Sequence, residues 1–411
     1  MINSFKLIFY IILFIPLEIS AEKPYVLMVS FDGFRYDYMN WTDTPHFDYI
    51  EKTGVKADGL IPVFPSLTFP NHYSIATGSY VDTHNISGNS FYDKSLKQKY
   101  SLYNSDTVQD HRFYKAEPIW VTAEKQGIKS ASFFWVGSEA SIKGVSPSIF
   151  KYYNSDIPFK TRIDSVITWF QLEEDKRPQL ILLYFSEPDK TGHEYGVQGE
   201  EIIESVSKMD NLLGYLHEKL ELLEIYSQLN IIITSDHGMT DVNSDRLIIL
   251  DDYISRVEDL YIYGSGSHVQ FDHKKGRIDY ADKLFQELKK IPHAQVWKKS
   301  EIPKRFHFVN ENTGDYLLLA DEGWFISTER TLKEEEFSLC GMHGYDPQII
   351  NMHGIFYAMG PYINSGLQIK SFENIHVYPL ICKLLNIEPY GLIDTPDGNL
   401  QVLQPILTNK R

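Results

Sequence analysis

Six side chains that can bind a metal ion stand in short glycine-containing segments spread along the chain. The segments are VSFDGFR with Asp32, EPDKTGHEYG with Asp189 and His193, SDHGM with Asp236 and His237, and HGYD with His343. Aspartate and histidine without thiolate suit zinc or manganese. Six ligands exceed what one tetrahedral ion accepts, so the set predicts two ions about 3.5 to 4 Å apart, which would hold the attacking and leaving oxygens in phosphoryl transfer.

Taken singly, each of these residues has a simpler interpretation. An aspartate at a strand end usually caps a helix or a turn, and an isolated histidine usually makes a structural hydrogen bond. The combination favours a site, because three aspartates and three histidines recur in glycine-containing segments and five of them follow predicted strands. Glycine lets the backbone come close to a bound group.

A threonine, Thr68, lies between two prolines in PSLTFPNHYSIATG, directly before a predicted short helix. A free threonine hydroxyl is a poor nucleophile, and coordination to a metal ion is one of the few ways to activate it. The prolines restrict the turn over residues 64–69, which would hold Thr68 near Asp32. Unpaired N–H groups at the start of the helix favour an anion. The alternative interpretation is that Thr68 only caps the helix.

Four short apolar runs predict the buried parallel strands that would position these residues. Residues 25–31 precede Asp32, residues 180–185 precede Asp189, residues 231–234 precede Asp236, and the fourth run covers residues 130–135. Helical patterns lie between them, over residues 45–52, 117–126, 161–172 and 200–223. This alternation indicates an α/β fold with a mostly parallel central sheet flanked by helices, and ligands bind outside the carboxyl ends of such strands.

The pattern changes from about residue 251 to residue 339. This stretch carries many charges and the strand candidates SHVQFD, AQVWKK and YLLLA around one helical pattern, residues 280–290. We expect a smaller α+β insert there, within a single catalytic domain formed by residues 22–411. After the insert, GIFYAMG is typical of a strand and residues 375–385 are typical of a closing helix.

Composition narrows the class of protein. With 411 residues, of which 43% are hydrophobic, the chain can bury a large core. Its net charge of −16 disfavours binding to duplex nucleic acid, so a polyanion would need a local site containing metal. Two cysteines, Cys340 and Cys382, allow one disulfide, but Cys382 in PLICKLL could equally be a small buried residue.

Residues 1–21 have the features of a signal peptide. A cationic Lys6 precedes the apolar run 7–17, and small residues follow before Glu22. That run is shorter than the about 20 apolar residues that a membrane span needs. We therefore expect an exported protein, periplasmic or extracellular, without a transmembrane anchor.

Five motifs occur in a fixed order along the chain: VSFDGFR, TFPNHYSIATG, EPDKTGHEYG, SDHGM and HGYD. With these motifs, residues 25–390 or so resemble the ectonucleotide pyrophosphatase/phosphodiesterase family of the alkaline phosphatase superfamily. The resemblance implies an alkaline-phosphatase-like fold and a two-zinc site with a threonine nucleophile and a covalent phosphothreonine intermediate. By matching motif, one zinc would be held by Asp32, Thr68, Asp236 and His237, and the other by Asp189, His193 and His343. Asn89 in ISGNSFYD matches the family asparagine whose amide would stabilise charge on the phosphoryl group.

The same resemblance implies a small nucleotide substrate whose base stacks between Phe69 and Tyr153, with Tyr184 as a further pocket residue. Hydrolysis would release a nucleoside 5'-monophosphate. Two departures concern the substrate: Val136 follows FFW where proline is usual, and Ser90 replaces a lysine frequent in nucleotide-specific members. One alternative is a choline-phospholipid phosphodiesterase with the same two-zinc chemistry, which would need an aromatic cage. Another is a binding protein without turnover, although a pure binder has no use for an activated threonine.

Overall fold

The structure is a computed structural model that describes residues 23–274, 278–334, 340–391 and 395–408. The predicted signal peptide, residues 1–21, lies outside the described residues. Within those ranges, none of the helices combines the length and the apolar character needed to cross a membrane. The two cysteines are not joined by a disulfide, and Cys382 is a buried thiol with 1% of its surface exposed.

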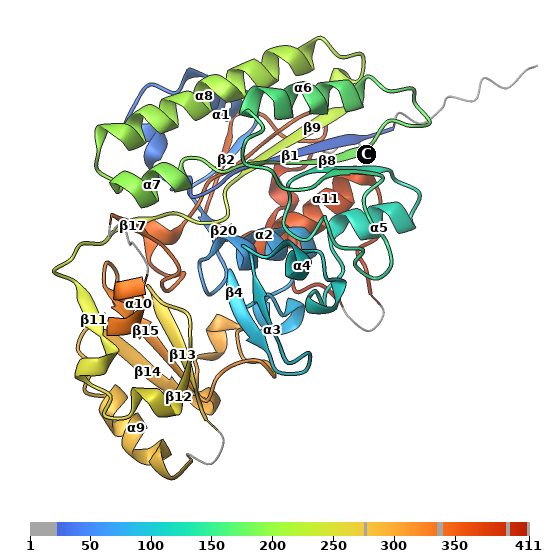
Figure 1. The fold of residues 1–411 in the computed structure, drawn as a ribbon. Coiled ribbons are helices and arrows are strands. Elements are labelled where there is room, and N and C mark those ends of the chain that lie inside the picture. The colour runs from blue at the N-terminus through green and yellow to red at the C-terminus, as the bar shows by residue number, and fades with distance from the viewer. Residues whose placement is uncertain (1–22, 275–277, 335–339, 392–394, 409–411) are drawn as a thin grey trace, which may run out of the picture.

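An eight-stranded sheet forms the centre of the molecule (Figure 1). Its order is β19 (Leu367–Ile369), β2 (Val55–Ala57), β18 (Phe356–Met359), β9 (Leu229–Thr234), β1 (Tyr25–Phe31), β8 (Leu180–Phe185), β6 (Ser130–Phe133) and β7 (Ile149–Lys151). The strands from β9 to β7 are parallel, whereas β18 is antiparallel to β9 and β2. The prediction of a mostly parallel α/β sheet is confirmed.

Helices cover both faces of this sheet, and the seven residues of β1 are therefore all buried. On one face lie α1 (Pro45–Thr53), α6 (Phe159–Phe170), α7 (Asp189–Tyr195) and α8 (Glu200–Glu221), and on the other lie α2 (Thr68–Thr77), α5 (Ile119–Lys125) and α11 (Val377–Leu385). Successive β1 residues alternate between two cores: Leu27 and Val29 pack under α8, whereas Val26 and Met28 pack toward α11.

Most element boundaries lie within a few residues of those predicted. The strand predicted over residues 130–135 ends at Phe133, because Phe134 takes a left-handed backbone conformation with φ 73°. The closing helix begins at Val377 rather than at residue 375, after a short 3-10 turn over Asn374–His376.

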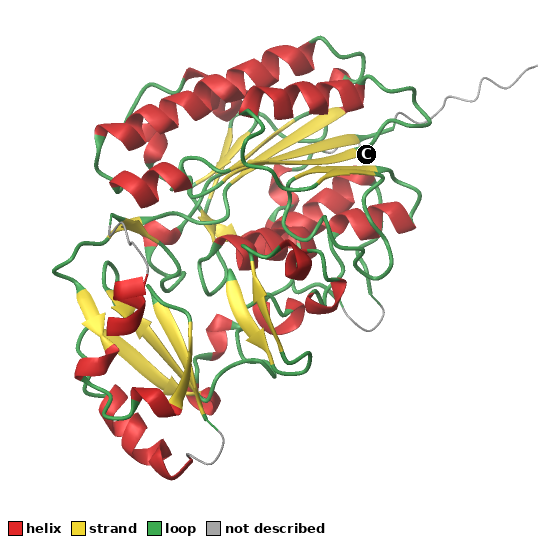
Figure 2. Ribbon diagram, in the orientation of Figure 1, coloured by secondary structure: helices red, strands yellow, loops and turns green. Residues whose placement is uncertain are grey.

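A second, antiparallel sheet lies beside the main one and has its own apolar core (Figure 2). Its order is β12 (Leu260–Tyr263), β13 (His268–His273), β15 (Tyr316–Ala320) and β14 (Ala294–Lys298), and α9 (Ala281–Leu288) packs on it through Leu284 and Leu288. The contents match the strand and helix patterns seen in the sequence. The insert boundaries, residues 251–339, stay a prediction.

Short elements connect the two sheets or extend them. They are β3 (Leu60–Ile61), α3 (Val81–His84), β4 (Ser90–Asp93), β5 (Gln98–Ser101), α4 (Ser105–Val108), β10 (Thr240–Asp241), β11 (Leu247–Ile249), β16 (Phe325–Ser327), α10 (Glu329–Glu334), β17 (Gly341–Met342) and β20 (Phe372–Glu373). Among them, β10 pairs with β17 and β11 pairs with β16, so the chain both leaves and re-enters the main layer by paired strands.

Candidate metal and nucleophile site

The candidate ligands converge at one edge of the large sheet, where the carboxyl ends of the parallel neighbours β1, β8 and β9 meet. Asp32 follows β1, Asp189 begins α7 after β8, and Asp236 follows β9. The backbone fixes the first two: the Asp32 N–H donates to the Phe185 carbonyl at 2.9 Å, and the Asp189 N–H donates to the Asp32 carbonyl at 3.0 Å. Carboxylates remote in sequence are therefore held side by side.

Gly33 makes this close approach possible. Its φ of 64° is left-handed, and a Cβ placed on it would lie 2.7 Å from the Cβ of Asp189. A side chain at Gly33 would push α7 away from β1. The glycine in VSFDGFR thus has a structural reason tied to the site.

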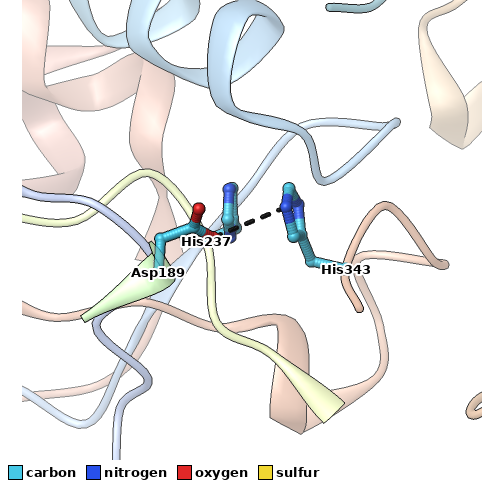
Figure 3. A group of neighbouring side chains, drawn as sticks. All are labelled: Asp189, His237 and His343. Carbon is cyan, nitrogen blue, oxygen red and sulfur yellow. Dashed lines mark ion pairs between the residues drawn. The ribbon is translucent and has the colours of Figure 1, made fainter. Parts of the chain in front are cut away.

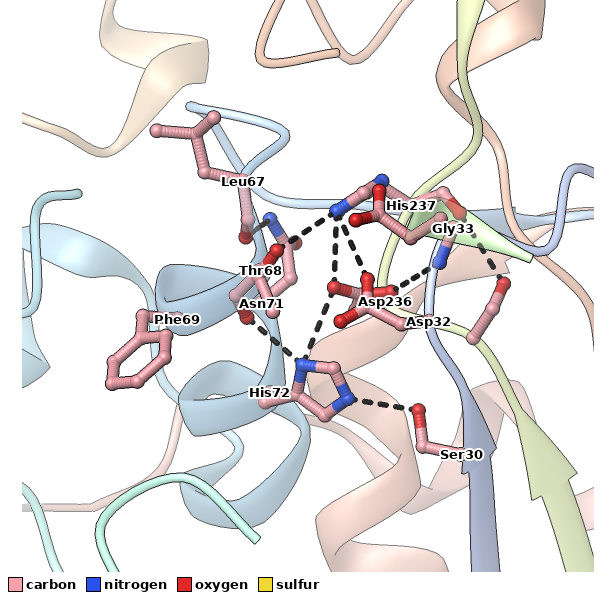
Figure 4. A network of polar contacts seen from close by, with 12 residues as sticks. Ser30, Asp32, Gly33, Leu67, Thr68, Phe69, Asn71, His72, Asp236 and His237 are labelled. Atoms are coloured by element: carbon pink, nitrogen blue, oxygen red, sulfur yellow. Dashed lines mark hydrogen bonds and ion pairs between the residues drawn. The ribbon is translucent and has the colours of Figure 1, made fainter. Parts of the chain in front are cut away.

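One group of ligand atoms is fully buried and comes from the ends of β1 and β9 (Figure 4). Asp32, Asp236 and His237 offer ligand atoms that all lie within 4.8 Å of one another. The Nε2 of His237 is 3.1 Å from Asp236 Oδ2 and 3.6 Å from Asp32 Oδ1. The Gly33 N–H donates to the second Asp236 oxygen, Oδ1, at 3.1 Å, which leaves Oδ2 directed at the histidine.

A second group lies beside the first and brings in the segment after β17 (Figure 3). Asp189, His237 and His343 again place ligand atoms within 4.8 Å of one another, and Asp189 Oδ1 is 3.5 Å from His343 Nε2. His193, one turn along α7 from Asp189, joins from the outer side, with its Nε2 3.1 Å from His343 Nε2. His237 stacks on His343 with ring centroids 3.6 Å apart, so it lies within reach of both groups.

The buried carboxylates and imidazoles are suited to binding metal ions. Three buried carboxylate oxygens have no hydrogen-bond partner among the described residues: Asp32 Oδ1, Asp189 Oδ1 and Asp236 Oδ2. A buried unpaired carboxylate oxygen is costly in a protein interior, and a cation is the natural partner for it. The imidazoles are also oriented as ligands require, since Nδ1 of His193 and of His343 each bonds a backbone carbonyl and leaves Nε2 toward the carboxylates.

Without a cation, the neighbouring buried carboxylates repel one another and their pKa values are shifted. Burial, together with the Asp236 and Asp189 carboxylates, raises the pKa of Asp32 well above its ordinary value. Burial would also raise the pKa of Asp236, but His237 and His72 outweigh it and hold that pKa well below its ordinary value. Divalent cations would relieve the repulsion between these carboxylates and favour their ionised forms.

Thr68 lies at the edge of the first group, as the first residue of α2. Its Oγ1 is 3.3 Å from His237 Nε2. The N-cap position is occupied by Leu67, so the alternative that Thr68 merely caps the helix is wrong. The turn before it is fixed by Asn71, whose side-chain amide donates to the Leu67 and Pro65 carbonyls at 2.8 and 3.0 Å. The hydroxyl therefore faces the site. The expectation of unpaired N–H groups at this helix start is wrong for its second and third residues, because the Phe69 N–H donates to Asn89 Oδ1 and Pro70 has no N–H.

His72 was not predicted from the sequence, yet it connects Thr68 to the ligand cluster (Figure 4). The side chain is fully buried, with Nδ1 2.9 Å from the Thr68 carbonyl and 3.3 Å from Asp236 Oδ2. Its Nε2 lies 2.8 Å from the Ser30 hydroxyl. An Nδ1–H tautomer satisfies these contacts, because it donates to Thr68 and accepts from Ser30. The available signal was its spacing, one helical turn after Thr68.

Asn89 lies close to Thr68. Its Oδ1 accepts the Phe69 N–H at 3.0 Å, next to Thr68 in the first turn of α2. Its position is therefore consistent with the predicted role toward the phosphoryl group, which stays a prediction.

The three aromatic residues predicted for the substrate pocket have different environments. Phe69 is partly buried and packs edge-on against Tyr100, with ring centroids 6.1 Å apart. Tyr153 is 53% exposed and packs against Phe134. The hydroxyl of Tyr184 donates to Asp32 Oδ2 at 2.6 Å, so this residue supports a candidate metal ligand. Their contacts with a substrate stay predictions.

A sequence model of the type I phosphodiesterase/nucleotide pyrophosphatase family matches residues 26–346. Among curated proteins, human ectonucleotide pyrophosphatase/phosphodiesterase family member 1 is 36% identical over 90% of this chain, and venom phosphodiesterase 2 of Crotalus adamanteus is also 36% identical over 90%. The chain covers only 40% and 46% of the lengths of these two proteins. Human family member 7 is 34% identical over 95% of the chain, which covers 85% of that protein.

A solved structure gives a closer match in length. An inactive variant of murine ectonucleotide pyrophosphatase/phosphodiesterase 5, solved in complex with AMP, superposes with a TM-score of 0.88 at 34% identity. The match covers 94% of this chain and 100% of the murine chain. The alkaline-phosphatase-like fold expected from the sequence is confirmed by this likeness.

Proposed function

Because the chain belongs to the type I phosphodiesterase/nucleotide pyrophosphatase family, we propose that it is a zinc-dependent hydrolase of nucleotides and their derivatives. It cleaves phosphodiester or pyrophosphate bonds and releases nucleoside 5'-monophosphates. The observation that carries this proposal is the Thr68 hydroxyl, 3.3 Å from His237 and beside buried carboxylate oxygens that face histidine nitrogens and have no hydrogen-bond partner among the described residues. We propose further that residues 22–411 act as one exported catalytic domain, with residues 251–339 as its insert.

Two zinc ions would be held by residues that the fold brings together. Asp32, Thr68, Asp236 and His237 would hold one, and Asp189, His193 and His343 would hold the other. When bound, the ions supply positive charge that lowers the pKa of a hydroxyl and neutralises phosphoryl oxygens. The position of His237 between the two groups supports ions sharing one compact site.

Hydrolysis takes two steps in which this chain supplies the nucleophile and the positioning. Thr68 Oγ1 loses its proton and forms a bond to phosphorus, while the bond from phosphorus to the leaving oxygen breaks. The product is a phosphothreonine esterified to the nucleoside. Water then attacks phosphorus opposite Thr68, Oγ1 regains a proton, and the nucleoside monophosphate leaves.

The surroundings of Thr68 stabilise the charge that develops. The Asn89 side-chain NH2 can donate to a non-bridging phosphoryl oxygen, while its Oδ1 holds the Phe69 N–H. His72 holds the Thr68 carbonyl and thereby limits movement of the nucleophile. Catalysis is then largely positioning and neutralisation of charge.

The nucleotide assignment rests on aromatic side chains that lie outside the ligand cluster. Phe69 follows the nucleophile directly, and Tyr153 exposes about half of its surface. A base stacked on such faces is recognised without a specific hydrogen bond. The murine relative solved with AMP supports a nucleotide here too.

The test compares p-nitrophenyl thymidine 5'-monophosphate with p-nitrophenyl phosphorylcholine, using zinc-loaded protein with and without a chelator. The proposal expects a chelator-sensitive kcat/KM at least about tenfold higher for the nucleotide, since one stacked base contributes about 1 to 3 kcal/mol. A preference for phosphorylcholine would overturn the substrate assignment. Bound zinc without hydrolysis of either ester would instead indicate a binding protein.

A further inference from the structure

Arg162 on α6 is a fully buried cation that lies between two aromatic rings. Its side chain has 0% exposure, and its Cζ is 4.7 Å from the Phe159 ring centroid and 5.0 Å from the Phe134 ring centroid. Its Nη2 is buried and has no hydrogen-bond partner among the described residues. Contact with two ring faces is therefore a main interaction of this guanidinium.

The other nitrogens of Arg162 tie it to the end of β8. Nη1 donates to the Tyr184 carbonyl at 3.0 Å, and Nε donates to the Ile157 carbonyl at 3.1 Å. Tyr184 in turn donates its hydroxyl to Asp32. The guanidinium is thus anchored to a strand whose side chains already belong to the site.

The ring of Phe134 contacts both the Arg162 guanidinium and the ring of Tyr153. Phe134 is 5% exposed and has a φ of 73°, a backbone conformation that is unusual for a bulky residue and must be held by its surroundings. Its ring lies 5.1 Å from the Tyr153 ring at an interplanar angle of 60°. The Tyr153 N–H donates to Glu139 Oε1 at 2.9 Å, so the backbone of Tyr153 is fixed separately.

We infer that Arg162 is a positioning residue for base recognition, which holds Phe134 in place so that Phe134 supports the half-exposed Tyr153 ring. The inference rests on the proposed function, because it assigns to Arg162 the affinity for substrates that carry a nucleobase. Arg162 does not touch the phosphoryl group in this account. Its loss should therefore change KM for nucleotides and leave the chemical step intact.

The test uses zinc-loaded Arg162→Met with two diesters that share the p-nitrophenyl leaving group. One is p-nitrophenyl thymidine 5'-monophosphate and the other, methyl p-nitrophenyl phosphate, lacks a base. We expect KM for the nucleotide to rise about five- to tenfold, the size of one aromatic contact, with kcat unchanged. The kcat/KM for the methyl ester should stay within about twofold of wild type.

Arg177→Met is the matched control, since Arg177 also bonds a backbone carbonyl, that of Leu172, but precedes the amino end of β8. Arg177→Met should leave the KM for the nucleotide and the kcat/KM for the methyl ester unchanged. Arg162→Lys keeps the charge without the planar fork, so its KM for the nucleotide should lie between those of wild type and Arg162→Met. If Arg162→Met lowers kcat/KM equally for both diesters, or lowers it for neither, the inference is overturned. If Arg162→Met does not fold, Phe134→Leu must show the same selective rise in KM.

Tyr153→Ala separates this inference from the proposed function. If Tyr153→Ala leaves KM for the nucleotide unchanged, base stacking itself is wrong. If Tyr153→Ala raises that KM and both Arg162→Met and Phe134→Leu do not, stacking stands and only the role of Arg162 is wrong.

Discussion

His72→Leu should separate the positioning of the nucleophile from the binding of substrate. The leucine fills much of the same buried space but removes both hydrogen bonds, to the Thr68 carbonyl and to the Ser30 hydroxyl. Each buried group left unpaired costs about 1 to 3 kcal/mol, so we expect a loss of about 2 to 6 kcal/mol in the free energy of unfolding. Freeing the first turn of α2 by about 1 Å would lower kcat about 100-fold.

A second variant and a control make this prediction specific. His72→Asn can keep a donor near the position of Nδ1, so it should recover most of the kcat lost in His72→Leu. His84 is equally buried and bonds Ser74 on the same helix at 2.8 Å, but its hydrogen bonds within the described part of the chain do not reach the ligand cluster. His84→Leu should lose stability without losing kcat.

The assay is steady-state hydrolysis of p-nitrophenyl thymidine 5'-monophosphate by zinc-loaded protein, with urea unfolding to confirm that each variant is folded. A wild-type kcat in folded His72→Leu would show that His72 does not position Thr68. An equal loss of kcat in His84→Leu would show the same, because the effect would then belong to α2 stability in general.

Three further predictions concern pH, packing and thiol reactivity. Burial lowers the pKa of His84 to about 3 from 6.5, so the unfolded chain binds a proton that the folded chain refuses, and the free energy of unfolding should fall as pH drops below about 6.5. Between pH 7 and pH 5 this contributes about 2 kcal/mol in urea titrations, and His84→Asn should remove that contribution. Gly192→Ala should lower zinc affinity and kcat, because its Cβ would overlap the Met239 sulfur and displace α7, and adding Met239→Ala should restore part of both. Burial raises the pKa of the Cys382 thiol to about 12, so Ellman's reagent should reach it only after unfolding, and rapid labelling of Cys382 in native protein would contradict the packing seen here.

Much of the site could be predicted because parallel strands impose it. Asp32, Asp189 and Asp236 follow adjacent strands, and the carboxyl ends of parallel neighbours meet at one edge of the sheet whatever the helices do. Thr68 was predictable from the restriction that two prolines place on its turn. The strand pattern also predicted the main sheet, since runs such as YVLMVSF are apolar on both faces.

Other features depend on tertiary contacts that no local pattern contains. His72 lies in a helix interior, and only the approach of β1 and β9 turns it into a partner of Ser30 and Asp236. The bond from the Tyr184 hydroxyl to Asp32, at the end of the neighbouring strand, was not predicted, and the contact of Tyr184 with substrate stays a prediction. The pairing order in the small sheet, where β15 lies between β13 and β14, is likewise set by side-chain packing rather than by sequence spacing.

The central claim, that Thr68 is the nucleophile of a metal-dependent site, is tested most directly by rapid-quench mass spectrometry. Zinc-loaded protein would be mixed with p-nitrophenyl thymidine 5'-monophosphate, quenched in acid and digested. The account predicts a thymidylyl group on the peptide that contains Thr68, and no such adduct in chelated protein or in Thr68→Ala, which should also lose kcat at least about 1000-fold. Undiminished turnover by Thr68→Ala, with no adduct at Thr68 in the wild type, would contradict the account.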